Sequence, residues 1–355
     1  MRKRVIVLFG GRSAEHEISC ISARSVIESL DQDRYEVVPI GIAKDGTWRL
    51  MPAGPPAIEK GAKALPEVEP SGHELALGES TLTQTGSVDV VFPVLHGPYG
   101  EDGAVQGFLE MAGVPYVGAG VLGSALGMDK DLQKTVLRAA GLPVVDWIAV
   151  HEREWNDDRE AVEARAQDLG YPLFSKPAGL GSSVGIAKVE SSAGLVAAVD
   201  HAFLFDSKVV LEVAVDAPRE IECAVLGNED PTASLPGEIR PSNEFYDYSA
   251  KYLDEASELI IPADLPEATI EEIQRMAVVA FRAIEGEGMA RVDFFIDADG
   301  GLVVNELNTI PGFTSISMYP KMWEASGLSY PQLLDRLIEL AIEKHERARS
   351  KKTSP

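Results

Sequence analysis

Short apolar runs alternate with helical spacing of apolar residues along the first third of the chain. Runs of the length of a buried strand lie at residues 5–9, 35–42 and 88–95. Apolar residues with helical spacing lie at residues 13–30 and 103–112. Because strands that alternate with helices form parallel sheets with crossover helices, we expect an α/β domain over residues 1–119. Residues 51–86 interrupt this pattern with Pro, Gly, Ala and Glu, and we expect a surface excursion there.

From about residue 120 the pattern changes to that of a small α+β unit, which we expect to cover residues 120–213. The strands and helices predicted within it lie at residues 129–140, 144–150, 159–169, 173–176, 186–189, 193–203 and 209–215. A third unit is expected over residues 214–355. It begins with a strand at residues 220–226, and helical spacing predicts helices at residues 266–284 and 330–347.

The stretch RVDFFIDADGGLVVNELNTIPG, residues 291–312, contains an acidic turn between two apolar runs. A calcium loop that starts at Asp297 is excluded, because its sixth position needs glycine and its twelfth needs glutamate, where the chain has leucine and asparagine. Asp-Gly between β-branched and aromatic runs predicts instead a hairpin, with a two-residue turn at Asp299 and Gly300.

This hairpin predicts a polar face. Pairing about the turn places Asp293 opposite Glu306 and Arg291 opposite Asn308, and directly paired residues share a face. The apolar face would carry Val292, Phe294, Ile296, Val303 and Leu307. Two adjacent carboxylates repel each other unless a positive charge lies between them, and oxygen ligands on a rigid sheet suit a hard cation such as Mg²⁺. A solvated face with an arginine–carboxylate pair is the alternative, and the hairpin alone leaves both open.

A second stretch, LFSKPAGLGSSVGIAKV, has the composition of an anion-binding loop. Its glycines allow backbone N–H groups to turn toward an anion, and the hydroxyls of Ser182 and Ser183 add donors. Lys176, held extended before Pro177, can reach a phosphate, and Lys130 stands at the start of a predicted helix. The loop lacks the Gly-Lys-Ser/Thr of a Walker sequence, so a flexible hairpin loop with surface lysines is the alternative.

Two further turns follow strands of the first domain. GGRSAEHEIS leads from a strand into a helix, where free N–H groups can hold an anion, and an N-cap at Ser13 is the alternative. HGPYGEDG follows the strand at residues 88–95, and in open parallel sheets such strand ends line the ligand crevice. His96 is therefore either a site residue or part of the turn.

Composition narrows the class of function. Lys and Arg total 32 against 56 Asp and Glu, and the resulting net charge of -24 argues against a nucleic-acid partner, whose binding rests on neutralising phosphates. No stretch approaches the roughly 20 apolar residues that a membrane helix needs. Cys20 and Cys223 lie far apart in apolar segments, so we expect buried free thiols and a cytoplasmic location.

Seven motifs, taken in order, resemble the D-alanine:D-alanine ligase family of the ATP-grasp superfamily, and the match covers nearly the whole chain. They are GGRSAEHEIS, HGPYGEDG, GMDK, the SKP and GSSVG segments of one loop, EFYDYSAKY, RVDFF and NELNTIPGFTSISMYP. The resemblance implies a Rossmann-like pre-ATP-grasp domain with a parallel sheet (1–119), a central ATP-grasp small domain (120–213) and a C-terminal ATP-grasp domain (214–355). ATP would lie between the sheets of the last two.

The resemblance also implies the residues that contact ATP and metal. The ATP-binding residues would be Lys130, Lys176, Ser183, Glu212, Glu220 and Lys251. Among them, the first two lysines would contact the α- and β-phosphates, the third lysine the γ-phosphate, and the two glutamates adenine and ribose. Asp293, Glu306 and Asn308 would be the metal ligands, which is the face that the hairpin pairing predicts. The implied cofactors are ATP with two Mg²⁺ or Mn²⁺ ions, and a monovalent cation.

The amino-acid site is implied in the same way. Glu15 would receive the ammonium of the first D-alanine, and Ser182 and Tyr252 would complete a hydrogen-bonded triad that closes the loop. His96 would lie near this substrate. The remaining catalytic and second-substrate residues would be Arg291 and Gly312, which stabilise the tetrahedral intermediate, and Ser317 and Met318, which hold the second carboxylate. The family more often has leucine at the last position, a swap that conserves volume.

The implied reaction joins two D-alanines through an acyl phosphate, for peptidoglycan precursor synthesis, in a homodimer. A depsipeptide ligase that makes D-alanyl-D-lactate is the nearest alternative, and the intact YDYSAKY segment favours the dipeptide. Another ATP-grasp ligase or a carboxylase comes next. A nucleotide-binding regulatory protein without chemistry is the alternative from another class, and the intact set of acidic, arginine and lysine residues argues against it.

Overall fold

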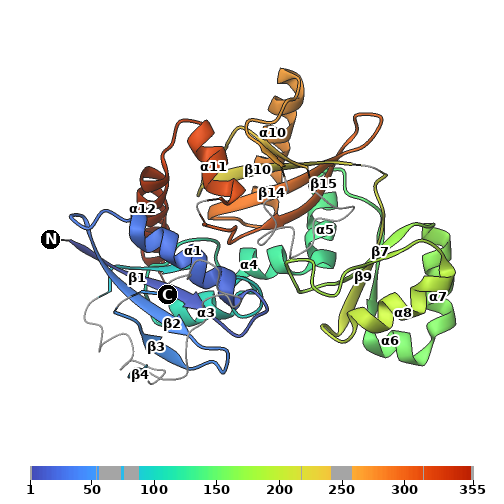
Figure 1. Cartoon of the computed structure of the whole chain (residues 1–355), viewed down its shortest axis with the longest axis horizontal. Coiled ribbons are helices and arrows are strands. Elements are labelled where there is room, and N and C mark those ends of the chain that lie inside the picture. Colours follow the sequence, from blue (N-terminus) through green and yellow to red (C-terminus); the bar gives the residue numbers. More distant parts are fainter. Residues whose placement is uncertain are drawn as a thin grey trace.

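The computed structural model describes residues 2–52, 54–55, 73–75, 88–216, 218–240, 258–314 and 316–352. Figure 1 shows three sheets, each with its own helices. Their strand orders are β4-β3-β2-β1-β5, β6-β9-β7-β8 and β13-β12-β10-β14-β15, with β11 paired to β10. Among the described residues, no helix is long and apolar enough to cross a membrane.

The first sheet confirms the predicted parallel core. Its strands are β1 (Lys3–Gly10), β2 (Tyr35–Ile42), β3 (Trp48–Leu50), β4 (His73–Leu75) and β5 (Val90–Pro93). Both β2 and β5 pair with β1 in parallel, whereas β3 and β4 extend one edge with antiparallel strands. Helices α1 (His16–Ser29) and α3 (Ala104–Met111) pack on opposite faces of this sheet.

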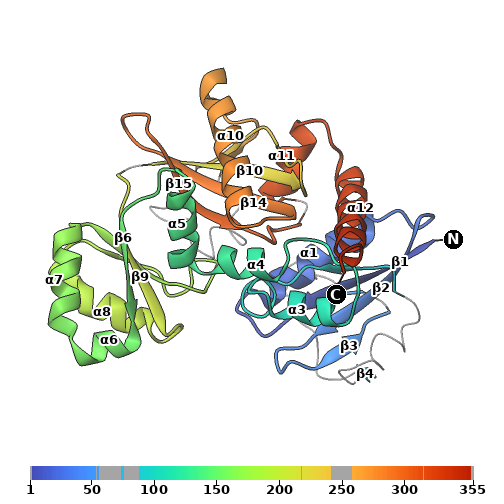
Figure 2. The ribbon, with the colours of Figure 1, turned by 180° about the vertical axis from the view of Figure 1, so that it is seen from behind.

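The second sheet is antiparallel and has a separate core. Its strands and helices are β6 (Trp147–His151), α6 (Glu152–Asp157), α7 (Arg159–Leu169), β7 (Leu173–Pro177), β8 (Ala187–Val189), α8 (Ser192–Ala202) and β9 (Lys208–Val213). Its three helices lie together, in the green lobe of Figure 2. Val209 and Leu211 of β9 face the core of this lobe, so Glu212 between Leu211 and Val213 faces away from the helices.

The third sheet carries the predicted hairpin. Its strands are β10 (Arg219–Gly227), β11 (Thr232–Ala233), β12 (Gly237–Arg240), β13 (Glu258–Ile260), β14 (Gly288–Ile296) and β15 (Leu302–Asn308). The associated helices are α4 (Val121–Met128), α5 (Lys130–Ala139), α10 (Glu267–Ala283), α11 (Met318–Ala325) and α12 (Tyr330–Arg349). The core-facing side of the sheet packs with α10 and with Leu137 of α5. Helix α5 therefore packs on this sheet, although it precedes the second sheet in sequence.

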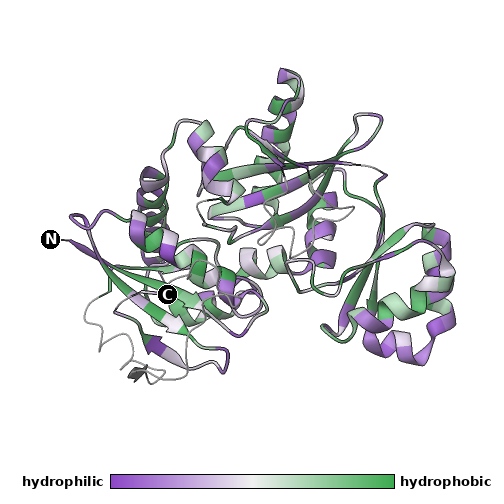
Figure 3. Ribbon diagram, in the orientation of Figure 1, coloured by the Kyte–Doolittle hydropathy of each residue, from purple (hydrophilic) through white to green (hydrophobic). Residues whose placement is uncertain are grey.

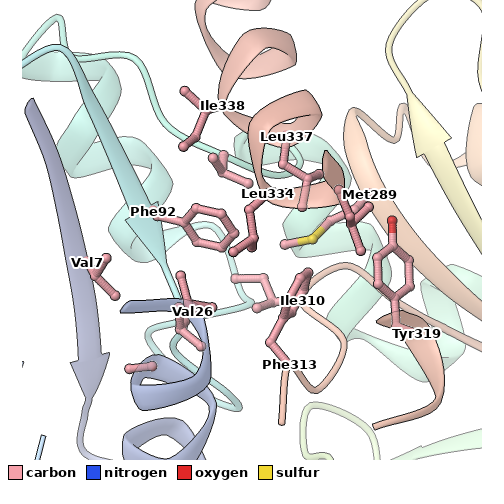
Figure 4. Close-up of a cluster of buried hydrophobic side chains, with 14 of the residues drawn as sticks. Val7, Val26, Phe92, Met289, Ile310, Phe313, Tyr319, Leu334, Leu337 and Ile338 are labelled. Carbon is pink, nitrogen blue, oxygen red and sulfur yellow. The ribbon is translucent and has the colours of Figure 1, made fainter. Parts of the chain in front are cut away.

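Helix α12 joins the first and third units through one shared core. Figure 4 shows Leu334, Leu337 and Ile338 of this helix directed toward Phe92 of β5 and Met289 of β14. Its apolar face matches the prediction, because the predicted positions are buried: Leu333, Leu334, Leu337, Leu340 and Ala341. Figure 3 shows hydrophobic positions concentrated along the sheets and hydrophilic ones on the outer sides of the helices.

Candidate active site

The register of three neighbouring strands sets an acidic face. Asp293 pairs with Glu306 and Arg291 with Asn308, as the sequence predicts. On the other side of β14, Asp293 pairs with Glu222 of β10. Since paired residues share a face, three carboxylates lie side by side on one side of the sheet, opposite its apolar core.

The turn of the hairpin is longer than the predicted two residues. The backbone N–H of Asp297 donates to the Gly301 carbonyl at 3.0 Å, which leaves three residues in the loop. Oδ1 of Asp297 accepts the N–H groups of Asp299 at 2.9 Å and Gly301 at 2.7 Å, and Gly300 takes φ +84°. The prediction of a two-residue turn is wrong because the Asp297 carboxylate stabilises a larger turn.

A β-bulge in β15 compensates for the longer turn. The register shifts next to Asp293, because Phe294 pairs with Val304 and Asn305 is the extra residue. Val304 rather than the predicted Val303 is therefore buried in the core. The bulge restores the predicted register at Asp293 and beyond, so the polar face is correct although the turn is not.

Gln133 of α5 covers the free edge of β15. Its Nε2 donates to the carbonyl of Leu307 at 2.9 Å and to that of Gly127 at 2.6 Å, and its Oε1 accepts the Leu307 N–H at 3.1 Å. The side-chain amide thus bonds Leu307 as a neighbouring strand would. Because Leu307 lies between Glu306 and Asn308, this contact positions both. Sequence reasoning missed Gln133, since one glutamine in a helix carries no signal by itself.

Arg291 and Asp293 are joined by two parallel hydrogen bonds. Nε donates to Oδ1 and Nη2 to Oδ2, each at 2.7 Å, and Asn308 Nδ2 donates to the same Oδ2 at 3.2 Å. Arg291 Nε also lies 3.2 Å from Oε2 of Glu222. Burial opposes the charge of the guanidinium, but Asp293 and Glu222 raise the pKa of Arg291 well above its ordinary value.

The donor set suits a divalent cation after one rearrangement. Asp293, Glu306 and Asn308 offer carboxylate and amide oxygens, which are the ligands that hard cations prefer. Within the part of the chain that the structure describes, no three His, Cys, Asp or Glu side chains converge on one metal position. Arg291 donates to both oxygens of Asp293, so a cation bound here would compete with the guanidinium.

Buried lysines converge on Glu212, on the face of the second sheet away from its helices. Lys134 Nζ lies 3.1 Å from Oε2 of Glu212, and Lys176 Nζ forms an ion pair with Oε1. Lys130 Nζ donates to the Leu180 carbonyl. Burial lowers the pKa of Lys130 and Lys134, and for Glu212 the opposing effect of burial is outweighed by the two lysines, which lower its pKa. Sequence reasoning missed Lys134, although its spacing of four from Lys130 places both on one helix face.

The glycine-rich loop between β7 and β8 reaches Glu15. Ser182 and Ser183 take φ values of +49° and +59°, and the Ser182 hydroxyl donates to Oε1 of Glu15. A Cβ atom on Gly181 would lie 3.3 Å from Oε2 of Glu15, and one on Gly97 2.8 Å from it. The carboxylate is therefore enclosed by two glycine backbones and one hydroxyl.

The start of α1 explains why Glu15 is available for this contact. We expected Ser13 as an alternative N-cap, but Glu15 occupies the N-cap position, and its side chain makes no capping hydrogen bond. The hydroxyl of Ser13 instead accepts the backbone N–H of Glu15 at 3.2 Å. The Glu15 carboxylate is thus directed toward Ser182.

His96 is held in one orientation. Its Nδ1 lies 3.1 Å from the Ile310 carbonyl and must donate, so Nε2, 3.4 Å from the Ser22 hydroxyl, accepts. Burial lowers the pKa of His96 below its ordinary value, although the negative charge of Glu15 opposes this. His96 is therefore a neutral imidazole at pH 7, next to the Glu15 carboxylate.

Glu101 is a site residue that the sequence motifs contained but did not single out. Its Oε2 accepts the Gly97 N–H at 2.6 Å. Burial, followed by the negative charge of Glu15, raises the pKa of Glu101 to about 8. The only sequence signal for it is its place in the HGPYGEDG turn at the end of β5.

Gly312 and Ser317 lie on the connection from β15 to α11, and Met318 is the first residue of α11. Ser317 Oγ accepts the Thr314 N–H at 3.0 Å, and a Cβ atom on Gly312 would lie 2.9 Å from this oxygen. Met318 is buried, and its Cε occupies the space next to Gly237, where an added Cβ would lie 2.4 Å away. A side chain at position 237 or 312 would therefore displace the end of Met318 or of Ser317.

One pocket joins several of these groups. Its lining includes Glu101, Lys130, Leu180, Gly181, Glu306 and Asn308. Glu220 lies on the same sheet face, paired with Phe295, but does not line the pocket. Lys251 and Tyr252 lie outside the described residues. Lys130, the acidic-face residues Glu306 and Asn308, and Gly181 beside Glu15 therefore surround one pocket, to which all three units contribute.

Comparisons with known proteins show the family of the chain. Residues 4–119 match the family model of the D-ala D-ala ligase N-terminus, and residues 136–339 match that of the D-ala D-ala ligase C-terminus. The D-alanine--D-alanine ligase of Paenarthrobacter aurescens is 50% identical over 96% of this chain and 95% of its own length. That of a Thermoanaerobacter species is 51% identical over 97% and 98%.

Solved structures extend the likeness to the fold. The D-alanine-D-alanine ligase from Coxiella burnetii has a TM-score of 0.82 and 41% identity over 98% of this chain and 96% of its own. The VanG D-Ala:D-Ser ligase from Enterococcus faecalis has a TM-score of 0.79 and 36% identity over 96% and 100%. Fold and site define an enzyme of the ATP-grasp class. Within that class, the chain belongs to the D-alanine–D-alanine ligase family.

Proposed function

We propose that this chain uses ATP to join two D-alanines into D-alanyl-D-alanine for peptidoglycan precursor synthesis. The observation that carries the proposal is the contact between Glu15 of the first unit and Ser182 of the glycine-rich loop. This contact holds the loop over Glu15, a buried carboxylate whose negative charge suits a substrate ammonium. The same loop lies beside Lys130. An ammonium and a phosphate can thus be held on the two sides of one loop.

Residues of two units would hold ATP. Lys130 and Lys176 would contact the α- and β-phosphates, and the Ser183 hydroxyl adds a donor on the loop. Lys251 is proposed for the γ-phosphate. The remaining two proposed contacts are Glu212 for adenine and Glu220 for ribose, and Glu212 would keep its ion pairs with Lys134 and Lys176.

Asp293, Glu306 and Asn308 would hold the divalent cations, and we propose two Mg²⁺ or Mn²⁺ ions. A monovalent cation is proposed nearby. The divalent cations would neutralise phosphate oxygens of ATP. The acidic face supports this proposal, because three carboxylates on adjacent strands carry more negative charge than one arginine offsets.

The chemistry then follows from the charges of the site. Glu15 would bind the ammonium of the first D-alanine, with neutral His96 beside it. The carboxylate of this D-alanine would then be free to attack the γ-phosphate. A P–O bond would form between the carboxylate oxygen and the γ-phosphorus, while the bond from the γ-phosphorus to the β–γ bridging oxygen breaks and ADP leaves with that oxygen. The carboxylate thereby becomes an acyl phosphate with a good leaving group. Ser182 and Tyr252 would close the loop over it, because water would hydrolyse this intermediate.

The second D-alanine would complete the reaction. Ser317 and Met318 would hold its carboxylate, and its neutral amine would attack the acyl carbon and displace phosphate. Arg291 and the N–H of Gly312 would meet the oxyanion of the tetrahedral intermediate, an effect worth roughly 3 to 4 kcal/mol per donor in comparable sites. The amine loses one proton as the amide forms, and the displaced phosphate can accept it.

We propose D-alanine as the second substrate, in preference to D-serine or D-lactate. VanG is named a D-Ala:D-Ser ligase, and D-lactate is the alternative that a depsipeptide ligase would use. The intact YDYSAKY segment supports D-alanine. We further propose a cytoplasmic homodimer, and domains at residues 1–119, 120–213 and 214–355.

The test is ADP release by the full chain with MgATP and D-alanine, compared with D-alanine plus D-serine, D-alanine plus D-lactate, and L-alanine alone. We expect ADP and D-alanyl-D-alanine in equal amounts with D-alanine, and no ADP above background with L-alanine. ADP release that does not depend on D-alanine would refute the proposal. Formation of D-alanyl-D-lactate or D-alanyl-D-serine at pH 7 would instead assign the chain to the depsipeptide or D-serine ligases.

A further inference from the structure

Glu222 is a buried carboxylate on the site face of the third sheet that no motif of the sequence singles out. Only 6% of it is exposed, and its strand β10 is an interior strand, between β12 and β14. It pairs with Asp293 across the strands, and its Oε2 lies 3.2 Å from Nε of Arg291. Ile221 and Cys223 on the same strand belong to the apolar core on the other face. The core therefore does not require an acid at this position.

Arg291 and Asp293 have competing tasks under the proposed function, on which this inference rests. Asp293 would hold a cation, yet both of its oxygens accept hydrogen bonds from Arg291. A divalent cation at Asp293 would repel the guanidinium, so Arg291 must release at least one oxygen. A largely buried guanidinium without a carboxylate is costly, so a second carboxylate within reach is needed.

We propose that Glu222 is the positioning residue that holds Arg291 when Asp293 turns to the cation, and so keeps the guanidinium where the oxyanion forms. The distance of 3.2 Å requires only a small rotation of Arg291. Strands β10 and β15 flank β14 on opposite sides, so a guanidinium that turns to Glu222 moves away from Glu306 and Asn308. The cation and the guanidinium then occupy separate halves of the face.

A purely structural ion pair is the competing explanation, and the chain contains a matched control. Glu238 of β12 is also buried, and it holds Arg219 through two hydrogen bonds of 2.8 Å. It pairs with Ile221, so it lies on the core-facing side of the same sheet. Glu238→Gln thus removes one buried negative charge from this sheet without touching Arg291.

The test compares Glu222→Gln, Glu222→Asp and Glu238→Gln with the wild type, all as the full chain. The readouts are kcat, KM for ATP, the melting temperature, and the affinity for Mn²⁺ with ADP by electron paramagnetic resonance. We expect Glu222→Gln to lower kcat and Mn²⁺ affinity by about 10- to 100-fold each, because Arg291 then stays on Asp293. Glu222→Asp should recover part of both losses, and Glu238→Gln should change neither.

A double-mutant cycle with Arg291→Lys separates positioning from structure. Glu222→Gln should lower kcat much less in the Arg291→Lys background than alone, because its effect passes through the guanidinium. Full additivity would overturn the inference, and so would wild-type kcat and Mn²⁺ affinity in Glu222→Gln. If that variant does not fold, wild-type kcat in Glu222→Asp overturns it. A wild type that releases no ADP with D-alanine refutes the proposed function instead.

Discussion

Gln133 and Leu307 are bonded to each other as two strands of a sheet are, although one of them contributes only a side chain. The amide of Gln133 accepts the Leu307 N–H at 3.1 Å and donates to its carbonyl at 2.9 Å. This bond pair ties the helix that begins at Lys130 to the strand that carries Glu306 and Asn308. The phosphate side and the metal side of the proposed site are thus held at a fixed separation.

Gln133→Met is expected to weaken both stability and the metal site. Both backbone groups of Leu307 would lose their partner in a buried environment, which costs about 1–3 kcal/mol in the free energy of unfolding. Urea unfolding measures this loss, and Mn²⁺ binding measures the effect on the ligands. Gln274→Met is the control, because Gln274 bonds the Ser234 carbonyl in the same unit, away from β15. Equal Mn²⁺ affinity in both variants would contradict the role of Gln133.

Glu306→Gln is expected to abolish turnover while the chain stays folded. The change keeps the shape of the side chain and removes one of two facing carboxylates, so the melting temperature should stay or rise. Mn²⁺ affinity should fall together with ADP release. Retention of wild-type turnover would remove Glu306 from the metal ligands.

Gly237→Ala is expected to act on the second substrate. The new methyl group would lie 2.4 Å from Cε of Met318, so the end of this side chain must move. We expect KM for the second D-alanine to rise while KM for ATP stays constant, as measured by steady-state kinetics. Gly194→Ala is the control, since its nearest contact is 3.8 Å away. An unchanged second KM would contradict the proposed place of Met318.

Lys344 predicts how stability changes with pH. Its Nζ donates to the Gly118 carbonyl at 2.7 Å and lies 3.7 Å from the centre of the Tyr116 ring. Burial lowers the pKa of Lys344 from 10.5 to about 8, although Glu287 opposes this. Between these values the unfolded chain binds the proton and the folded chain does not, so raising the pH stabilises the fold.

The measurement is the free energy of unfolding of the wild type minus that of Lys344→Met, between pH 7 and pH 10. The difference should increase from about pH 8 upward, in the direction that favours the wild type. Lys351→Met, at an exposed lysine, should show no such trend. A difference that is flat or decreases with pH would contradict the buried environment of Lys344.

The sequence predicted the acidic face well for a reason that is partly fortuitous. Period-two alternation placed Asp293 beside Glu306, and the structure has the same pairs. The longer turn adds one residue on the side of β14, and the bulge adds Asn305 to β15. Because the two extra residues lie on opposite strands, the register at Asp293 and beyond is unchanged. Pattern alone could not show either, because both depend on the Asp297 carboxylate and on the contact of β15 with α5.

The residues that sequence reasoning missed share one property. Glu101, Gln133, Lys134 and Glu222 act through contacts between elements that are far apart in the chain. The local pattern of apolar and polar residues carries no information about such contacts. The helices and strands themselves could be predicted from periodicity, as for the helix at residues 159–169. The contact of Glu15 with Ser182 was accessible only through the family resemblance, and the structure contains it.

The most direct test of the central claim uses D-alanine labelled with ¹⁸O in its carboxylate. Attack of that carboxylate on the γ-phosphate, followed by displacement by the amine, transfers one carboxylate oxygen to phosphate. We expect the full chain with MgATP to release ADP and inorganic phosphate, with one ¹⁸O in phosphate per D-alanyl-D-alanine formed. Unlabelled phosphate, or ¹⁸O recovered in AMP, would contradict it.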